Sequence, residues 1–187
     1  MDKVSMLLTL YSIIAGLGIS RLVQGVTAMI QVRSNLRFYW MHTTWIVIIF
    51  MAHIVSWFAL MRFATGAHWT VFNAMLALFM PILLYVVSDL AVPPLGDGRH
   101  TDLREYFFHN CRWFAGLMIA FVVCGGAVQI AVEHQADLSG GALLRALAFV
   151  TLAVGVWSRR PAVQATVALA MLAIGTAGAA LISVKLM

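Results

Sequence analysis

The chain has 187 residues, of which 63% are hydrophobic and only 10% are charged. Soluble domains carry about 25% charged residues, so this composition indicates a protein whose solvent is lipid and excludes an ordinary soluble domain. The formal net charge is +5, but the basic residues are scattered between apolar runs and form no patch of the kind that nucleic-acid binding requires. We therefore expect no nucleic-acid partner.

Six apolar runs approach or exceed the length of about 20 residues that crosses a bilayer as a helix. They predict an all-α integral membrane protein: one polytopic domain over residues 1–187, built as a bundle of six transmembrane helices. The fifth run is the shortest, and we count it because Pro161 suits the first position of a following helix. The predicted spans are 6–30, 38–63, 69–92, 112–132, 142–157 and 162–186.

Basic residues are distributed unevenly between the two ends of these spans. Short loops rich in Lys and Arg stay in the cytoplasm, so the chain is expected to cross a bacterial-type inner (plasma) membrane several times with both termini in the periplasm. The arginines of the first, third and fifth connections are Arg33, Arg37, Arg99, Arg104, Arg112, Arg159 and Arg160, and the opposite side carries Lys3, Arg62 and Lys185.

The first span contains a permanent positive charge, Arg21, within the stretch GLGISRLVQG. A charge inside a span usually faces protein or water and often marks a functional site. Small or polar residues recur every four positions beside it, which predicts a face that admits a close neighbouring helix. The residues of this face are Ser12, Gly16, Ser20 and Gln24.

The third span supplies the obvious counter-charge, because Asp89 is the only acidic residue well inside the apolar runs. We predict that Arg21 pairs with Asp89, either as a structural pair or as part of a working site. Arg21 and Asp89 form a predicted intramembrane polar site together with nearby polar residues of spans one to three. Its residues are Arg21, Gln24, His53, Tyr85, Ser88 and Asp89.

The connection before the fourth span begins with Pro93 and Pro94, which end the third helix. Asp102 and Glu105 have the spacing of a capping box, so a new helix is expected to begin there and lead into span four. Further along the chain, Arg145 is expected near the outer surface, with Glu133 or Asp137 as its partner. Cys111 and Cys124 lie about 20 Å apart on one predicted helix, too far for a disulfide.

Cofactor chemistry has little support in the sequence. A membrane haem would need two histidines on different helices at matching depth, and His42 and His109, which could share the cytoplasmic leaflet, are kept as low-priority haem ligands. The chain has no Cys/His cluster, no paired carboxylates and no Gly-rich phosphate loop, so we predict no cofactor, no metal site and no catalytic residue. An enzyme is the less favoured class.

Three functional hypotheses remain. The leading one is a small inner-membrane transporter or channel whose polar site lies between helices one to three. The alternative is an accessory or assembly subunit of a larger membrane complex, and a weaker alternative is a haem- or quinone-binding redox subunit. The expected partners are membrane lipids and either further copies of the chain or other membrane subunits. The sequence indicates no transported species.

Overall fold

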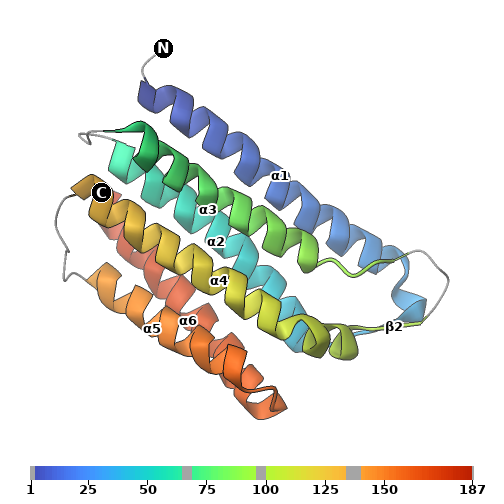
Figure 1. Ribbon diagram of the computed structural model, residues 1–187. Coiled ribbons are helices and arrows are strands. Elements are labelled where there is room, and N and C mark those ends of the chain that lie inside the picture. The colour runs from blue at the N-terminus through green and yellow to red at the C-terminus, as the bar shows by residue number, and fades with distance from the viewer. Residues whose placement is uncertain (1–2, 65–68, 96–99, 134–139, 187) are drawn as a thin grey trace.

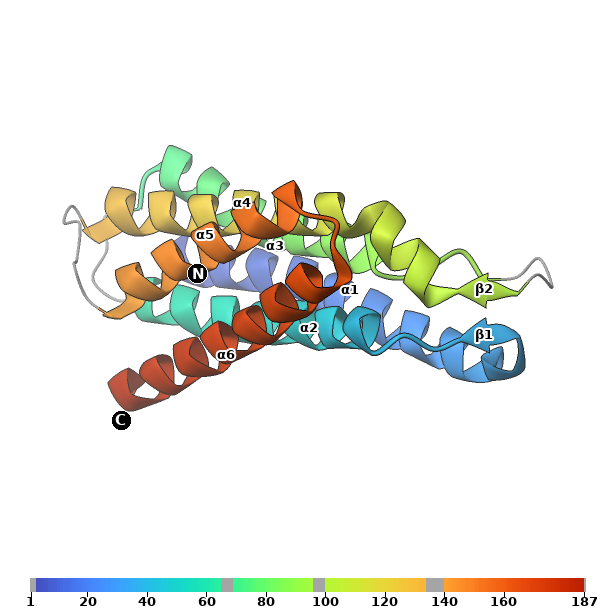
Figure 2. The same cartoon turned by 90° about the horizontal axis from the view of Figure 1, so that it is seen from below.

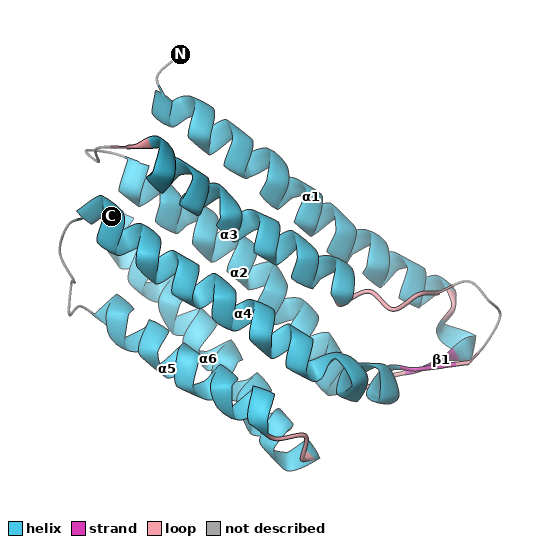
Figure 3. Ribbon diagram, viewed as in Figure 1, coloured by secondary structure: helices cyan, strands magenta, loops and turns pink. Residues whose placement is uncertain are grey.

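The protein is described here from a computed structural model, which covers residues 3–64, 69–95, 100–133 and 140–186. Within these ranges the chain forms six α-helices, one 3₁₀ turn and two very short strands (Figures 1 and 3). The helices are α1 (Lys3–Gln31), α2 (Trp40–Ala64), α3 (Val71–Leu90), α4 (Leu103–Glu133), α5 (Gly140–Trp157) and α6 (Pro161–Leu186). The 3₁₀ turn is η1 (Arg33–Asn35), and the strands are β1 (Leu36–Arg37) and β2 (Thr101–Asp102).

The helices fall on the six predicted runs, and five of them are long and apolar enough to cross a membrane. The exception is α5, whose apolar segment Gly141–Trp157 is shorter. The largest difference is the start of α4, which begins at Leu103 instead of residue 112. The Asp102 carboxylate accepts hydrogen bonds from the backbone N–H groups of Arg104 at 2.8 Å and Glu105 at 3.4 Å, so it caps a helix that continues without a break.

The helices α2 and α4 lie in the middle of the bundle, and the other four helices lie on either side of them. In Figure 1, α1 and α3 lie along one edge and the α5–α6 hairpin lies along the other. α1 packs on α3 and α2, α4 packs between α3 and α5, and α6 packs on α2 and α5. Both termini lie at one end of the bundle and the two strands lie at the opposite end, as expected for an even number of antiparallel crossings.

Two helices extend beyond the others at the strand end. At a rise of about 1.5 Å per residue, the 20 residues of α3 span about 30 Å, which matches the hydrocarbon thickness of a bilayer. The 29 residues of α1 and the 31 residues of α4 span about 43 and 46 Å. β1 and β2 join these extensions as a parallel pair, with Leu36 opposite Thr101 and Arg37 opposite Asp102.

A salt bridge also joins the two strands. Arg37 Nη1 lies 3.3 Å from Asp102 Oδ2. The backbone N–H of Arg104 and the nearby Arg37 guanidinium both lower the pKa of Asp102, because they stabilise its ionised form. Asp102 therefore serves as the helix cap and as the strand-to-strand contact at once.

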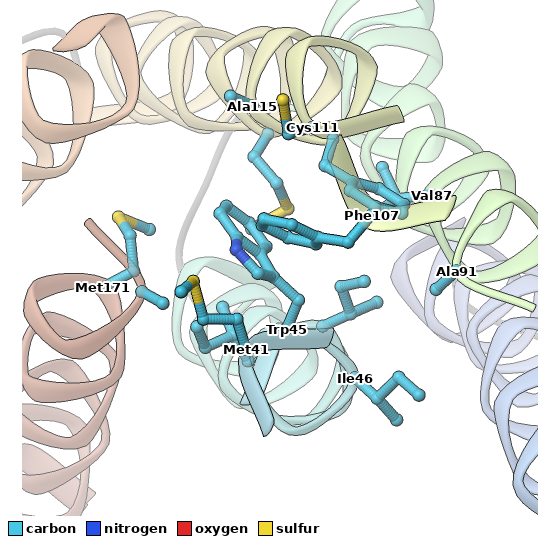
Figure 4. Close-up of a cluster of buried hydrophobic side chains, with 14 of the residues drawn as sticks. Met41, Trp45, Ile46, Val87, Ala91, Phe107, Cys111, Ala115 and Met171 are labelled. Atoms are coloured by element: carbon cyan, nitrogen blue, oxygen red, sulfur yellow. The ribbon is translucent and has the colours of Figure 1, made fainter. Parts of the chain in front are cut away.

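Aromatic rings fill the centre of the bundle near the strand end. Trp45 of α2 stacks on Phe114 of α4 with ring centroids 6.2 Å apart, and Phe107 stacks on Phe114 at 6.1 Å. Figure 4 shows Trp45 and Phe107 at the centre of this cluster, with Met41 and Met171 on the Trp45 side and Val87 on the Phe107 side. Because lipid tails are as apolar as these side chains, helix association here depends on close packing and dispersion contacts more than on the hydrophobic effect.

Two glycines allow α1 to approach its neighbours. A Cβ atom on Gly18 would lie 2.2 Å from His53 Nε2 of α2, and one on Gly25 would lie 2.1 Å from Val92 Cγ2. Larger residues at either position would force α1 away from the bundle. The face that α1 buries therefore contains Gly18 and Gly25, and it is not the face that contains Ser12 and Gly16.

Candidate functional site: an ion pair at the outer face of α1 and α3

Arg21 of α1 and Asp89 of α3 form the predicted ion pair. Arg21 Nε donates a hydrogen bond to Asp89 Oδ1 at 2.6 Å. The side chains are 36% and 57% exposed, respectively, so the pair lies on the outer surface of the bundle and not in its interior. In the described part of the chain, this is the guanidinium's only hydrogen bond. Its other N–H groups are available to lipid headgroups, water or another protein.

The two residues of the pair lie at different distances from the ends of their helices. Arg21 is central in its apolar run, but Asp89 is the penultimate residue of α3. α3 alone has about the length of the hydrocarbon thickness, so the pair lies at one end of a helix of bilayer length. α1 continues past this level toward β1. The charge of Arg21 is therefore paired with a carboxylate in the last turn of α3.

Two more residues of the predicted site lie on the outer surface. Tyr85 precedes Asp89 by one helical turn on α3 and is 39% exposed. Gln24 follows Arg21 by about one turn on α1, is exposed, and donates from Nε2 to Ser20 Oγ at 3.2 Å. The structure thus brings four of the six predicted site residues to the outer side of α1 and α3.

The other two predicted site residues, His53 and Ser88, are buried. Ser88 Oγ donates to the carbonyl of Leu84 at 2.8 Å. His53 Nδ1 lies 3.1 Å from the carbonyl oxygen of Ile49, and because a carbonyl only accepts, we assign the ring hydrogen to Nδ1. His53 Nε2 then faces Gly18 without a hydrogen-bond partner among the described residues.

The outer face of α1 carries a continuous row of small or polar side chains, which we call the α1 stripe. Successive members are three or four residues apart, and this spacing keeps them on one side of a helix. All of them are exposed. The α1 stripe consists of Ser5, Thr9, Ser12, Gly16, Ser20, Gln24 and Thr27.

Most of this face has no close neighbour within a single copy of the chain, although Trp57 Nε1 of α2 donates a hydrogen bond to Ser12 Oγ at 2.9 Å. Nothing lies within 4 Å of a Cβ atom built on Gly16. The hydroxyls of Thr9, Ser12 and Thr27 donate to carbonyls one turn earlier in α1, at 2.8, 2.7 and 2.9 Å. These donors are satisfied within the helix, so the α1 stripe can face lipid or another helix at low cost.

The two candidate haem ligands lie in different environments. His42 is buried against the rings of Tyr106 and Phe114, with centroids 5.9 and 6.5 Å away. His109 is exposed on α4. A haem between them would require His42 to leave its aromatic surroundings.

One described partner of Arg145 is an amide that was not expected from the sequence. Arg145 donates to Gln129 Oε1, which connects α5 to α4. Asp137 and the side chain of Glu133 lie outside the described residues, so their pairing with Arg145 stays a prediction. Arg99 also lies outside them.

Cysteine and metal chemistry have no assembled site in the ranges that the structure describes. Cys111 and Cys124 are free and buried, as expected from their separation. Within the same ranges, no group of three or more His, Cys, Asp or Glu side chains could hold a metal ion. No protein-family model matches the chain, and comparisons with curated proteins and with solved structures also find no match.

Proposed function

We propose that this protein is a membrane-embedded assembly subunit that self-associates through the outer face of α1. One observation carries the proposal: the α1 stripe is exposed along its whole length and lies beside the half-exposed pair of Arg21 and Asp89. The chain itself is an apolar helical bundle that fits a multi-pass membrane protein.

The α1 stripe has the side chains that helix association in lipid requires. Small residues let two backbones approach closely, so dispersion contacts and interhelical hydrogen bonds can form. From Ser5 to Thr27 the α1 stripe spans 23 residues of the 29 in α1, a distance of about 33 Å at a rise of 1.5 Å per residue. A neighbouring helix could therefore contact it over most of the length of α1.

A second copy of the chain is the occupant that this face favours. In a two-fold dimer the same surface meets itself, and a row of small residues is complementary to an identical row. The ion pair adds a polar contact at the edge of the same face. The Arg21 N–H groups that Asp89 does not take can then donate across the interface instead of facing lipid.

A transporter or channel is the second candidate function. The exposure of the predicted polar residues indicates where its path would run. Arg21, Gln24, Tyr85 and Asp89 are on the outside of a single copy. A polar path that uses these residues would therefore run between subunits and not through one bundle. Under this hypothesis any flux through the protein depends on the same self-association.

The proposal is tested by the mass of the protein in lipid nanodiscs. We expect the wild-type chain to form dimers or larger oligomers, and Gly16→Leu to shift it to monomers because a bulky side chain separates the two α1 helices. Leu17→Phe is the matched control, because Leu17 is 57% exposed but lies beside the α1 stripe. A monomeric wild type, or an oligomer that Gly16→Leu leaves intact, would contradict the proposal.

A further inference from the structure

Three arginines lie close together where α4 passes the turn between α5 and α6, and we call them the basic corner. The basic corner consists of Arg112 of α4 with Arg159 and Arg160 of the turn, and all three are exposed. α4 and α5 touch nearby, because a Cβ atom built on Gly155 would lie 3.8 Å from the Cβ atom of Ala115. Arg112 is three residues from Ala115 and Arg159 is four residues from Gly155, both toward the strand end. The two arginines therefore lie at about the same level of the bundle.

The position of the turn beside α4 has further support. The thiol of Cys111 lies within electrostatic range of both Arg112 and Arg159. In Figure 2, α4 continues past the α5–α6 turn toward β2, so the turn lies beside the body of α4 and not at its end. Gln164 holds the turn together, since its Nε2 donates to two carbonyls of the turn at 2.7 and 2.6 Å. The turn thus keeps its two arginines next to α4.

The basic corner has no counter-charge among the residues that the structure describes. The salt bridges in these ranges involve Arg21 and Arg37 instead. No acidic residue follows Asp137 in the sequence, and the acidic residue of α4 nearest to Arg112 is Glu105, seven residues or about 10 Å away along the helix. Like charges at one place repel one another, so an anion that joins them is favoured.

The surroundings of the basic corner are those of a lipid headgroup. Trp113 adjoins Arg112 and is 67% exposed, and Trp157 ends α5 and is 89% exposed. Tryptophan rings are enriched at the level of the headgroups in membrane proteins. A row of exposed apolar side chains runs from Trp157 back toward the start of α5 at helical spacing. The row consists of Val154, Val150, Leu147 and Leu143.

We propose that the basic corner binds the phosphate of an anionic phospholipid whose acyl chains lie along this apolar row of α5. Guanidiniums bind phosphate well through parallel N–H donors, and basic residues near the membrane surface attract anionic lipids. A zwitterionic lipid has the same phosphate, but its cationic headgroup is repelled by three arginines. The tryptophans and the apolar row favour a lipid over a soluble phosphate. The site is separate from the α1 stripe, so it does not depend on self-association.

The test is the affinity of the purified full-length chain in mild detergent for phosphatidylglycerol and phosphatidylcholine with identical acyl chains, measured by native mass spectrometry. We expect the wild type to bind phosphatidylglycerol about tenfold more tightly. Arg112→Gln/Arg159→Gln should abolish this preference. The matched control is Arg33→Gln/Arg104→Gln, which removes the same charge from exposed positions at the same end of the bundle and should keep the preference.

Glycerol 3-phosphate distinguishes a lipid site from a site for soluble phosphate. It has the phosphate without acyl chains, so at the concentration of the lipid it should not displace phosphatidylglycerol. Displacement would overturn the proposal. So would equal affinity of the wild type for the two lipids, an unchanged preference in Arg112→Gln/Arg159→Gln, or an equal loss of preference in the control.

Discussion

Arg21 Nε donates a 2.6 Å hydrogen bond to Asp89 Oδ1, and this bond connects α1 to the last turn of α3. Both side chains are partly exposed in one copy of the chain. The energy of the pair therefore depends on what covers it. In water an exposed pair contributes about 0–1 kcal/mol, whereas breaking a fully buried pair costs about 3–5 kcal/mol.

The first prediction compares the Arg21–Asp89 pair when it is exposed to solvent with the same pair when a second copy covers it. In detergent monomers, Arg21→Leu and Asp89→Leu should each lower the free energy of unfolding by no more than about 1 kcal/mol. In oligomers within lipid, each loss should rise toward about 3 kcal/mol, and the double variant should recover most of it because no uncompensated charge remains. Unfolding of the three variants in both media measures this. Additive losses in lipid would show that the two residues do not interact there.

The second prediction concerns the close approach of α1 and α2. Gly18→Ala places a Cβ atom 2.2 Å from His53 Nε2, so we expect a loss of about 1–3 kcal/mol in the free energy of unfolding. Gly16→Ala is the control, because the same added atom meets nothing within 4 Å. His53→Ala combined with Gly18→Ala should restore part of the stability. No difference between the two glycine positions would be inconsistent with the packing of α1 on α2.

The third prediction is a pH dependence at the strand end. Folding lowers the pKa of Asp102, so the folded chain favours its carboxylate. This contribution is complete above the ordinary carboxyl pKa of about 3.9 and is lost as the pH falls through the lower pKa of the folded state. Asp102→Ala should thus lower the melting temperature at pH 7, and the difference from the wild type should shrink below about pH 4. A constant difference across this range would contradict the role of the ionised carboxylate.

Much of the architecture could be predicted from the sequence, because apolar length alone locates membrane helices. The cap at Asp102 and the pairing of Arg21 with Asp89 also follow from local signals, namely capping spacing and the scarcity of acidic residues in the spans. The capping signal at Asp102 marked the start of α4 correctly, but the bound of span four was set at residue 112 because Arg104, Glu105 and Arg112 interrupt the apolar run. The helix continues through them since its opposite side buries Phe107 and Cys111.

The sequence could not predict which face of α1 packs into the bundle and which face lies outside. Both the buried face with Gly18 and the outer face with Gly16 have small residues at helical spacing. Which face is inside depends on neighbouring residues far away in the sequence, namely His53 against Gly18 and Val92 against Gly25. The apolar space lined mainly by α2, α4, α5 and α6 was missed for a related reason, since it depends on how several helices pack and no single segment encodes that arrangement.

The fourth prediction concerns orientation, which follows from the arginines at the strand end. Ser34 lies in η1 at that end, and Ser139 lies in the connection between α4 and α5, outside the described residues. We expect an impermeant thiol reagent added to intact cells to label Ser139→Cys and to leave Ser34→Cys unmodified. The native cysteines are buried and provide a low background. Labelling of Ser34→Cys alone would reverse the assigned orientation.

Self-association through the α1 stripe is tested most directly by cysteine cross-linking in native membranes, in a chain whose Cys111 and Cys124 are replaced by alanine. Single cysteines at Thr9, Gly16 and Ser20 should form disulfide-linked dimers under mild oxidation, because these positions would face a second α1. Cysteines at Leu10 and Leu17, which are 47% and 57% exposed but lie beside the α1 stripe, should not. Equal cross-linking at both sets of positions, or none at the α1 stripe, would contradict the account.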